Sequence, residues 1–194
     1  MYNSEEILAI LKAKDALLEG HFRLTSGRHA AYYMQCAKLL QYPDAAGPLC
    51  EQLAGQFADE HIDTVVGPAT GAIIIAYEVA RALKTKALFT ERENGVMCLR
   101  RGFEIKPGSR VLVVEDVVTT GGSVKEVIEV VRGFGAEVAG VGVLVDRSNG
   151  KIDFGVPLKA LVSLEIESFP PENCPLCKEG KLELVKPGSR QIKP

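Results

Sequence analysis

Residues 111–123 read Val-Leu-Val-Val-Glu-Asp-Val-Val-Thr-Thr-Gly-Gly-Ser, an order of residue types that predicts a strand, a loop and then a helix. The apolar, mostly β-branched run from Val111 to Val114 is typical of a buried strand. Two acids follow, and after them comes a loop of small residues. Beyond the loop, apolar residues recur at helical spacing, which predicts a helix over residues 124–134.

The small-residue loop has the properties of a phosphate-binding turn. A helix start presents unpaired backbone N–H groups and the positive end of the helix dipole, and both attract phosphate. Gly121 and Gly122 permit close approach by a ligand, and the hydroxyls of Thr119, Thr120 and Ser123 add hydrogen-bond donors. The lysine of a G-x-x-x-x-G-K-[ST] nucleotide loop is missing from this stretch. The loop therefore predicts a phosphate ligand other than a nucleoside triphosphate.

The two acids, Glu115 and Asp116, indicate what carries that phosphate. They stand a few residues before the loop, where carboxylates can accept hydrogen bonds from sugar hydroxyls and attract hydrated Mg²⁺. The implied ligand is a ribose 5-phosphate lying across the carboxyl end of the strand. The alternative is an ordinary strand-to-helix turn that carries acids near a helix start.

The run from Glu115 to Ser123 resembles the phosphoribosyl-pyrophosphate (PRPP) signature of type I phosphoribosyltransferases. The resemblance implies an α/β fold with a mostly parallel, doubly wound sheet, a small N-terminal hood and a flexible catalytic loop. It also implies Mg²⁺ as cofactor, bound mainly through PRPP, with no protein ligand assigned. The predicted PRPP-binding residues are Glu115, Asp116, Val117, Val118, Thr119, Thr120, Gly121, Gly122, Ser123 and Arg92.

The rest of the chain agrees with such a fold. Predicted strands and helices alternate, which argues for a parallel sheet with helices on both faces. The strands are expected at residues 64–67, 87–89, 111–114, 141–145 and 158–164, with helices at 73–83 and 124–134. Before them we expect a helix capped by Ser4 and continuing to Leu18, a short strand at 22–24 and a helix over 43–61. We expect residues 1–168 to form the phosphoribosyltransferase domain with its hood, and residues 169–194 a tail containing Cys, Pro and Gly.

Two residues narrow the resemblance to the orotate phosphoribosyltransferases. Arg147 follows a predicted strand, where its guanidinium can donate two parallel hydrogen bonds to a carboxylate. Orotate carries such a carboxylate and purine bases do not, and family members use an arginine in this Asp-Arg context. Thr119 stands where hypoxanthine-type relatives have an acid, and a neutral hydroxyl suits an anionic pyrimidine. Thr119 and Arg147 are the predicted orotate-binding residues. The alternative for Arg147 is a surface salt bridge with Asp146 or with an acid of a helix.

The segment over residues 90–107 is charged, and Asn94-Gly95 within it signals a hairpin. An arm of this kind could close over a ligand and bring Arg92, Arg100 or Arg101 to a diphosphate. For Arg100 and Arg101, a solvated surface hairpin is nearly as good an interpretation. Arg92 is better placed because it follows the end of a predicted strand.

Leu24 to Arg28, with Tyr32 and Tyr33 after it, resembles the family's base-binding segment. The chain departs from the family at Thr25 and around Thr70, where the usual lysines are missing. Charge on the diphosphate then needs other cations. The candidates are Arg28, Arg92, Lys106 and a loop from a second subunit.

The resemblance implies transfer of ribose 5-phosphate from PRPP to orotate, which yields orotidine 5′-monophosphate and diphosphate in pyrimidine biosynthesis. Asp116 and Arg92 are the predicted catalytic residues, and a homodimer is implied by the family alone. Two alternatives stay open. One is an adenine or xanthine phosphoribosyltransferase on the same fold, and the other is a non-catalytic PRPP-binding regulator.

Composition sets outer limits on these hypotheses. The chain has 194 residues, 46% hydrophobic and 25% charged, as in an ordinary globular domain. A formal net charge of −2 leaves no general basic surface for nucleic acid, so we expect no nucleic-acid partner. Five cysteines form an odd set, which favours free thiols in a reducing compartment. The acidic start is unlike a signal peptide and no apolar run is long enough to span a bilayer, so we expect a cytoplasmic protein without a membrane partner.

Cys174-Pro-Leu-Cys177 is a single C-x-x-C pair in the tail. One such pair supplies half a zinc site, and the sequence offers no second pair. A site shared across a dimer and two exposed thiols are the alternatives. The histidines at 21, 29 and 61 are scattered along the chain and are assigned no role.

Overall fold

The computed structural model describes residues 1–187, and its main body is a six-stranded sheet in the order β5-β4-β3-β6-β7-β8. Neighbouring strands run parallel except β4 and β5, which form an antiparallel hairpin. The chain order reverses between β3 and β6, as in doubly wound folds. The strands are β3 (Thr64–Pro68), β4 (Lys86–Glu93), β5 (Val96–Leu99), β6 (Arg110–Val118), β7 (Glu137–Asp146) and β8 (Leu158–Ser163).

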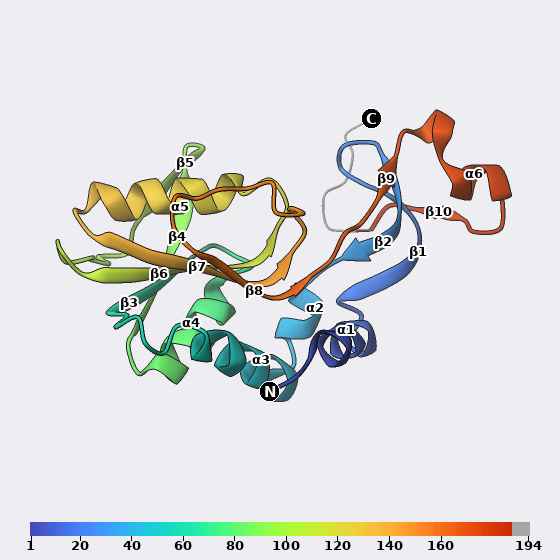
Figure 1. Ribbon diagram of the computed structural model, residues 1–194. Helices are drawn as coiled ribbons and strands as arrows, with labels where there is room; N and C mark the ends of the chain where they lie inside the picture. Colours follow the sequence, from blue (N-terminus) through green and yellow to red (C-terminus); the bar gives the residue numbers. More distant parts are fainter. Residues whose placement is uncertain (188–194) are drawn as a thin grey trace.

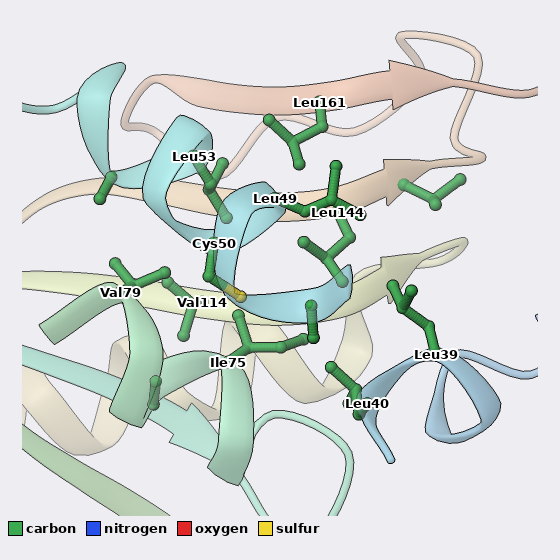
Figure 2. Packing of buried hydrophobic residues seen from close by; sticks show 14 of the residues in the cluster. Leu39, Leu40, Leu49, Cys50, Leu53, Ile75, Val79, Val114, Leu144 and Leu161 are labelled. Atoms are coloured by element: carbon green, nitrogen blue, oxygen red, sulfur yellow. The ribbon is translucent and has the colours of Figure 1, made fainter. Parts of the chain in front are cut away.

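Helices cover both faces of this sheet (Figure 1). α3 (Pro43–Gly55) and α4 (Ile73–Leu83) lie on one face, and α5 (Gly122–Gly133) lies on the other. Alternate residues of β6 point to opposite faces. Val114 packs with the α3/α4 cluster drawn in Figure 2, while Val113 packs in the cluster that includes the apolar stripe of α5. The predicted α/β class with a parallel, doubly wound sheet is confirmed.

A second, smaller sheet forms the predicted N-terminal hood, set to one side of the main sheet (Figure 1). Its strand order is β10-β1-β2-β9, so residues from 168 onward add both of its outer strands. Helices α1 (Ser4–Ala13) and α2 (Ala37–Leu40) flank the hood strands in the sequence. The other elements are β1 (Leu17–Arg23), β2 (His29–Met34), β9 (Ser168–Phe169), a 3₁₀ turn (Pro171–Asn173), α6 (Pro175–Glu179) and β10 (Leu184–Val185).

The predicted limits of two helices are wrong. The first helix is capped by Asn3, which forms a capping box with Glu6, and Ser4 is its first helical residue. It does not continue to Leu18, because residues 17–23 pair with β2 as a strand. Helix α3 stops at Gly55 instead of residue 61, and Phe57 then lies against β7, where a Cβ at Gly140 would approach its ring to 2.8 Å.

The Asn94-Gly95 hairpin is confirmed by the antiparallel pairing of β4 with β5. The strand after it, weakly indicated by the sequence, is β5. Over residues 1–187, no helix combines the length and the apolar character needed to cross a membrane.

Candidate active site

The candidate site lies where the chain order of the sheet reverses, at the carboxyl ends of β3 and β6. Ligands of open α/β sheets bind in the crevice at this position. Strand β3 pairs with β6 only as far as Val66 and Val113, whereas β7 accompanies β6 as far as Val118. The β3-facing edge of residues 115–118 therefore has no ladder partner. This extended pairing with β7 also makes Glu115 and Asp116 part of strand β6. The sequence had predicted that the strand ends at Val114 and that the two acids follow it.

The predicted phosphate turn lines a hollow of about 320 Å³, which we call the cradle hollow. Gly121 has φ 73° and stands at the cap position before α5, and no side chain caps that helix. A Cβ at residue 121 would lie 2.8 Å from the ring of Phe154, so both backbone conformation and space require glycine there. The lining residues are Arg92, Glu115, Val117, Val118, Thr119, Thr120, Gly121, Gly122, Ser123, Val124 and Glu126.

Arg92 reaches the cradle hollow from β4, the strand on the far side of β3. It donates to the carbonyl of Gly95 over 2.9 Å and forms an ion pair with Glu126 of α5 at 2.7 Å. The structure therefore brings Arg92 together with the Thr119–Ser123 turn, as the sequence suggested. It also supplies Glu126, which the sequence analysis did not consider.

A second hollow of about 400 Å³, the hood hollow, adjoins the first and shares Val117 and Thr119 with it. The hood contributes one wall and the ends of β6 and β7 contribute the other. Thr119 and Arg147, the two predicted base-binding residues, both line it. The full set is Thr25, Tyr33, Met34, Gln35, Cys36, Ala37, Asp116, Val117, Thr119, Arg147, Lys186 and Pro187.

Arg147 is a half-buried cation that forms no salt bridge with an acid in the described part of the chain. Its buried Nε–H donates to no hydrogen-bond acceptor among residues 1–187. The alternative of a salt bridge is not seen within residues 1–187; Asp146 Oδ1 accepts a hydrogen bond from the N–H of Ser148 over 2.7 Å. Burial lowers the pKa of Arg147, and the nearby Cys36 thiol partly opposes that shift. A guanidinium in this state is suited to an anionic ligand.

Glu115 and Asp116 form a buried acidic pair between the two hollows. Glu115 is only 9% exposed, and its pKa is raised to about 8 by burial first and by the charge of Asp116 second. Burial also raises the pKa of Asp116. The N–H of Val117 donates to Asp116 Oδ1 over 2.7 Å, and a Cβ at Gly71 would stand 3.1 Å from Oδ2. The pair therefore retains a proton near neutral pH, which a bound cation or hydroxyl donors can displace.

Several cations proposed from the sequence do not reach the site. Arg28 donates to the hydroxyl and the carbonyl of Ser168, and thereby ties the hood strands together. Lys106 lines a depression with Thr64 and Lys86, at the opposite ends of the strands. Arg100 and Arg101 pair with acids of their own hairpin, Glu91 and Glu93, at 2.9–3.5 Å. These pairs match the surface-hairpin alternative.

The structure supplies one cation that the sequence analysis missed. Lys186 follows β10 in the tail and lines the hood hollow opposite Thr119 and Arg147. No local pattern marks it, since it is one lysine in a Pro- and Gly-containing segment. Only the pairing of β10 with β1 carries it to the site.

The fold and the adjoining hollows define a type I phosphoribosyltransferase. The family described as Phosphoribosyl transferase domain matches residues 38–155. The orotate phosphoribosyltransferase of Pelotomaculum thermopropionicum is 61% identical over 188 residues, covering 97% of this chain and 98% of the relative. That of Thermotoga maritima is 54% identical over 187 residues, covering 96% and 100%. With relatives this similar over nearly their whole length, the chain belongs to the orotate phosphoribosyltransferase family.

A solved structure agrees with this assignment. The crystal structure of orotate phosphoribosyltransferase from Aeropyrum pernix superposes with a TM-score of 0.67 at 32% identity. The match covers 81% of this chain and 93% of that one. An adenine phosphoribosyltransferase from Rhodothermus marinus has a TM-score of 0.63 at 21% identity, which reflects the shared fold.

Proposed function

We propose that this chain transfers the 5-phosphoribosyl group of PRPP to N1 of orotate, releasing diphosphate and forming orotidine 5′-monophosphate. The observation that carries the proposal is the meeting of the two hollows at Val117 and Thr119. One hollow has the form of a phosphate cradle, and the other holds a half-buried guanidinium that forms no salt bridge with an acid of residues 1–187. A phosphorylated sugar and a carboxylated base bound there would meet at the shared wall.

The chain's own residues would act mainly by positioning and electrostatics. The backbone and hydroxyls of residues 119–123 hold the 5-phosphate at the start of α5. Glu115 and Asp116 accept hydrogen bonds from the ribose hydroxyls and stabilise positive charge developing on the sugar. Arg147 orients orotate by its carboxylate, while Arg92 offsets phosphate charge. The C1–O bond breaks as N1 attacks, and no covalent nucleophile is required.

The acidic pair also fits the proposed cofactor. Oxygen donors are the ligands that Mg²⁺ prefers, and Glu115 and Asp116 supply two neighbouring carboxyl groups whose pKa values are raised mainly by burial. When bound with PRPP, Mg²⁺ would neutralise part of the diphosphate leaving group.

Homodimerisation and a cytoplasmic location complete the proposal. Ile74 and Tyr77 lie on neighbouring turns of α4 with 44% and 64% exposure, and such an apolar pair supports a contact with a second copy. Light scattering of the wild type and of Tyr77→Glu would test this, with a dimer expected only for the wild type. Five free cysteines support a reducing compartment.

The proposed reaction is tested by following orotate consumption spectrophotometrically with PRPP and Mg²⁺. We expect loss of orotate and stoichiometric formation of diphosphate, with no turnover of adenine or xanthine. Turnover of a purine base instead of orotate would overturn the proposal in favour of the purine alternative. PRPP binding without turnover, combined with a gel shift of RNA or DNA, would favour a regulator.

A further inference from the structure

Four side chains that the reaction does not use converge at the outer end of the hood. They are His21 of β1, His29 of β2, Cys174 just before α6, and Cys177 within α6. Their ligand atoms all lie within 4.8 Å of one another, although His21 and Cys174 are 153 positions apart in the sequence. Figure 1 shows α6 and its flanking turns beside the β1–β2 hairpin. We call these residues the Cys2His2 cluster.

Four separations within this cluster are close to the edges of a tetrahedron around one metal ion, and all four ligand atoms lie within 4.8 Å of one another. With Zn–N bonds of about 2.05 Å and Zn–S bonds of about 2.3 Å, such edges are about 3.3 Å between nitrogens and about 3.6 Å between nitrogen and sulfur. His21 Nε2 and His29 Nδ1 are 3.2 Å apart. His21 Nε2 lies 3.5 Å from Cys174 Sγ and 3.6 Å from Cys177 Sγ, and His29 Nδ1 lies 3.2 Å from Cys177 Sγ.

Hydrogen bonds alone do not account for this arrangement. His21 Nδ1 lies 3.3 Å from the carbonyl of Leu182. When Nδ1–H donates a hydrogen bond to that carbonyl, a neutral His21 has an unprotonated Nε2 with one lone pair. That single lone pair faces three atoms at once, His29 Nδ1 and the two sulfurs. A cation at the centre satisfies all of them together. The Leu182 carbonyl then has the usual role of fixing the tautomer and orientation of a metal-bound histidine.

Burial and ligand type indicate which metal. Cys174 is fully buried, and His21 and His29 are 4% and 5% exposed, so an unneutralised thiolate in this position would be costly. Two thiolates and two imidazoles in a tetrahedral arrangement select Zn²⁺ among common cellular metals, and the two thiolate charges cancel the charge of the ion. Four protein ligands leave no open position, which is the arrangement of a structural zinc rather than a catalytic one.

The position of the cluster gives it a consequence for the active site. It fastens the tail to the β1–β2 hairpin immediately before the tail returns as β10, where Leu184 pairs with His21 and Val185 with Phe22. The next residue is Lys186, which lines the hood hollow. The same hairpin carries Thr25 into that hollow. A single ion would therefore hold in place two segments of the hood wall, the one with Thr25 and the one with Lys186.

We propose that His21, His29, Cys174 and Cys177 bind one structural Zn²⁺, which joins the tail to the hood and thereby positions Lys186 at the hood hollow. The C-x-x-C pair is thus completed by two histidines of the same chain, not by a second subunit. The alternative of two exposed thiols is wrong for Cys174, which is buried, while Cys177 is exposed. Under this proposal His21 and His29 gain the role that the sequence left unassigned.

The test is metal analysis of the full-length, reduced protein, produced without a histidine tag in zinc-supplemented medium. We expect about one zinc per chain, and X-ray absorption fitted by two sulfurs at about 2.3 Å and two nitrogens at about 2.0–2.1 Å. Cys174→Ser and His29→Ala should each lose most of the zinc. Cys98→Ser is the matched control, since Cys98 lies on β5 outside the cluster, and it should keep the wild-type metal content.

A second measurement covers the case in which a variant fails to fold. Wild-type protein stripped with a chelator and loaded with Co²⁺ should show thiolate-to-metal charge transfer and the intense visible bands of tetrahedral cobalt. Stripping should also speed proteolysis within residues 170–187 and lower the melting temperature by about 5 °C or more, with zinc restoring both.

Zinc well below one-tenth of an equivalent, together with a Co²⁺ spectrum lacking thiolate charge transfer, would overturn the proposal. These readouts do not involve orotate or PRPP. Failure of the zinc site and failure of the proposed reaction are therefore distinguishable.

Discussion

The cradle hollow and the hood hollow share a wall but are built in opposite ways. All residues of the cradle hollow except Arg92 come from the continuous run 115–126. The hood hollow takes its lining from the β1–β2 region, from the end of β6, from Arg147 and from Lys186 in the tail. The first is encoded by local sequence, whereas the second exists only once distant segments have packed together.

This difference indicates that the cradle hollow depends only on the main sheet and its helices, whereas the hood hollow also depends on the small hood sheet. The cradle needs one strand, one glycine with positive φ and one helix start, and all of them belong to the main core. The hood hollow also needs the small hood sheet, whose outer strands β9 and β10 are each two residues long. Short strands of this kind contribute little stability alone. Changes in the hood should therefore affect orotate before they affect PRPP.

The largest difference between the effects on orotate and on PRPP is expected from Arg147→Ala. Removing one partner of a buried, hydrogen-bonded charge pair costs about 2–5 kcal/mol, and each 1.4 kcal/mol is roughly tenfold. Since Arg147 is only half-buried, we expect kcat/KM for orotate to fall about 100-fold while the KM for PRPP stays near its wild-type value. Steady-state kinetics with each substrate varied in turn measures both.

Arg132→Ala is the control for that experiment, because Arg132 is an exposed side chain of α5 that pairs with Glu129 at 3.7 Å, outside the lining of either hollow. It should leave both constants unchanged. An unaltered orotate KM in Arg147→Ala would remove this residue from the base site.

Gly121→Ala should give the reverse pattern. The substitution forces a residue with a Cβ atom to adopt a positive φ, at a cost of about 1–2 kcal/mol. It also places that Cβ 2.8 Å from the ring of Phe154. We expect the KM for PRPP to rise about tenfold or more. The matched control is Gly133→Ala at the other end of α5, where a Cβ meets nothing within 4 Å. Equal effects of the two variants would show that the turn itself has no special part in binding.

The pH dependence of PRPP binding tests the acidic wall between the hollows. The folded-state pKa of Glu115 is about 8, above the ordinary value of 4.5, so the free protein holds a proton there over the range between those values. The pair's contribution to folding stability therefore falls as pH rises through this window. A ligand that needs the carboxylate must displace that proton, so affinity for PRPP with Mg²⁺ should rise by about threefold to tenfold over the pH unit below 8.

Calorimetry in buffers of different ionisation enthalpy would detect the accompanying proton release. Glu115→Gln should abolish the proton release and flatten the pH profile. Binding that weakens as pH rises towards 8 would contradict this account of the acidic pair.

The smallest effect is expected from Lys186→Ala. Lys186 is partly exposed, so its charge is screened by solvent and should contribute about threefold to the KM for orotate. Lys181→Ala is the control, since Lys181 is 78% exposed and pairs with Glu179. If the Cys2His2 cluster positions Lys186, removing zinc from Lys186→Ala should raise that KM less than removing zinc from the wild type. If zinc removal raises the KM for orotate by the same factor in Lys186→Ala and in the wild type, the Cys2His2 cluster does not act through Lys186.

The same contrast explains what could be predicted from the sequence. The run 115–123 carries its own geometry, because β-branched residues form the strand and Gly121 permits the turn, so the cradle and the parallel sheet followed from local rules. Lys106 was misassigned because the sequence does not reveal at which end of the sheet its loop emerges. Lys186 and the Cys2His2 cluster were missed because they depend on contacts between residues 148 or more positions apart. Leu17 was assigned to a helix because its partner, Met34, lies across a strand pairing that periodicity cannot detect.

The central claim is that one site has a phosphate half and a base half that can be disabled separately. Calorimetric titration of PRPP with Mg²⁺ into the wild type, Arg147→Ala and Gly121→Ala tests it most directly. The account predicts tight binding by the wild type, binding within about threefold of it by Arg147→Ala, and binding at least about tenfold weaker by Gly121→Ala. Loss of PRPP binding in Arg147→Ala, or wild-type binding in Gly121→Ala, would contradict it.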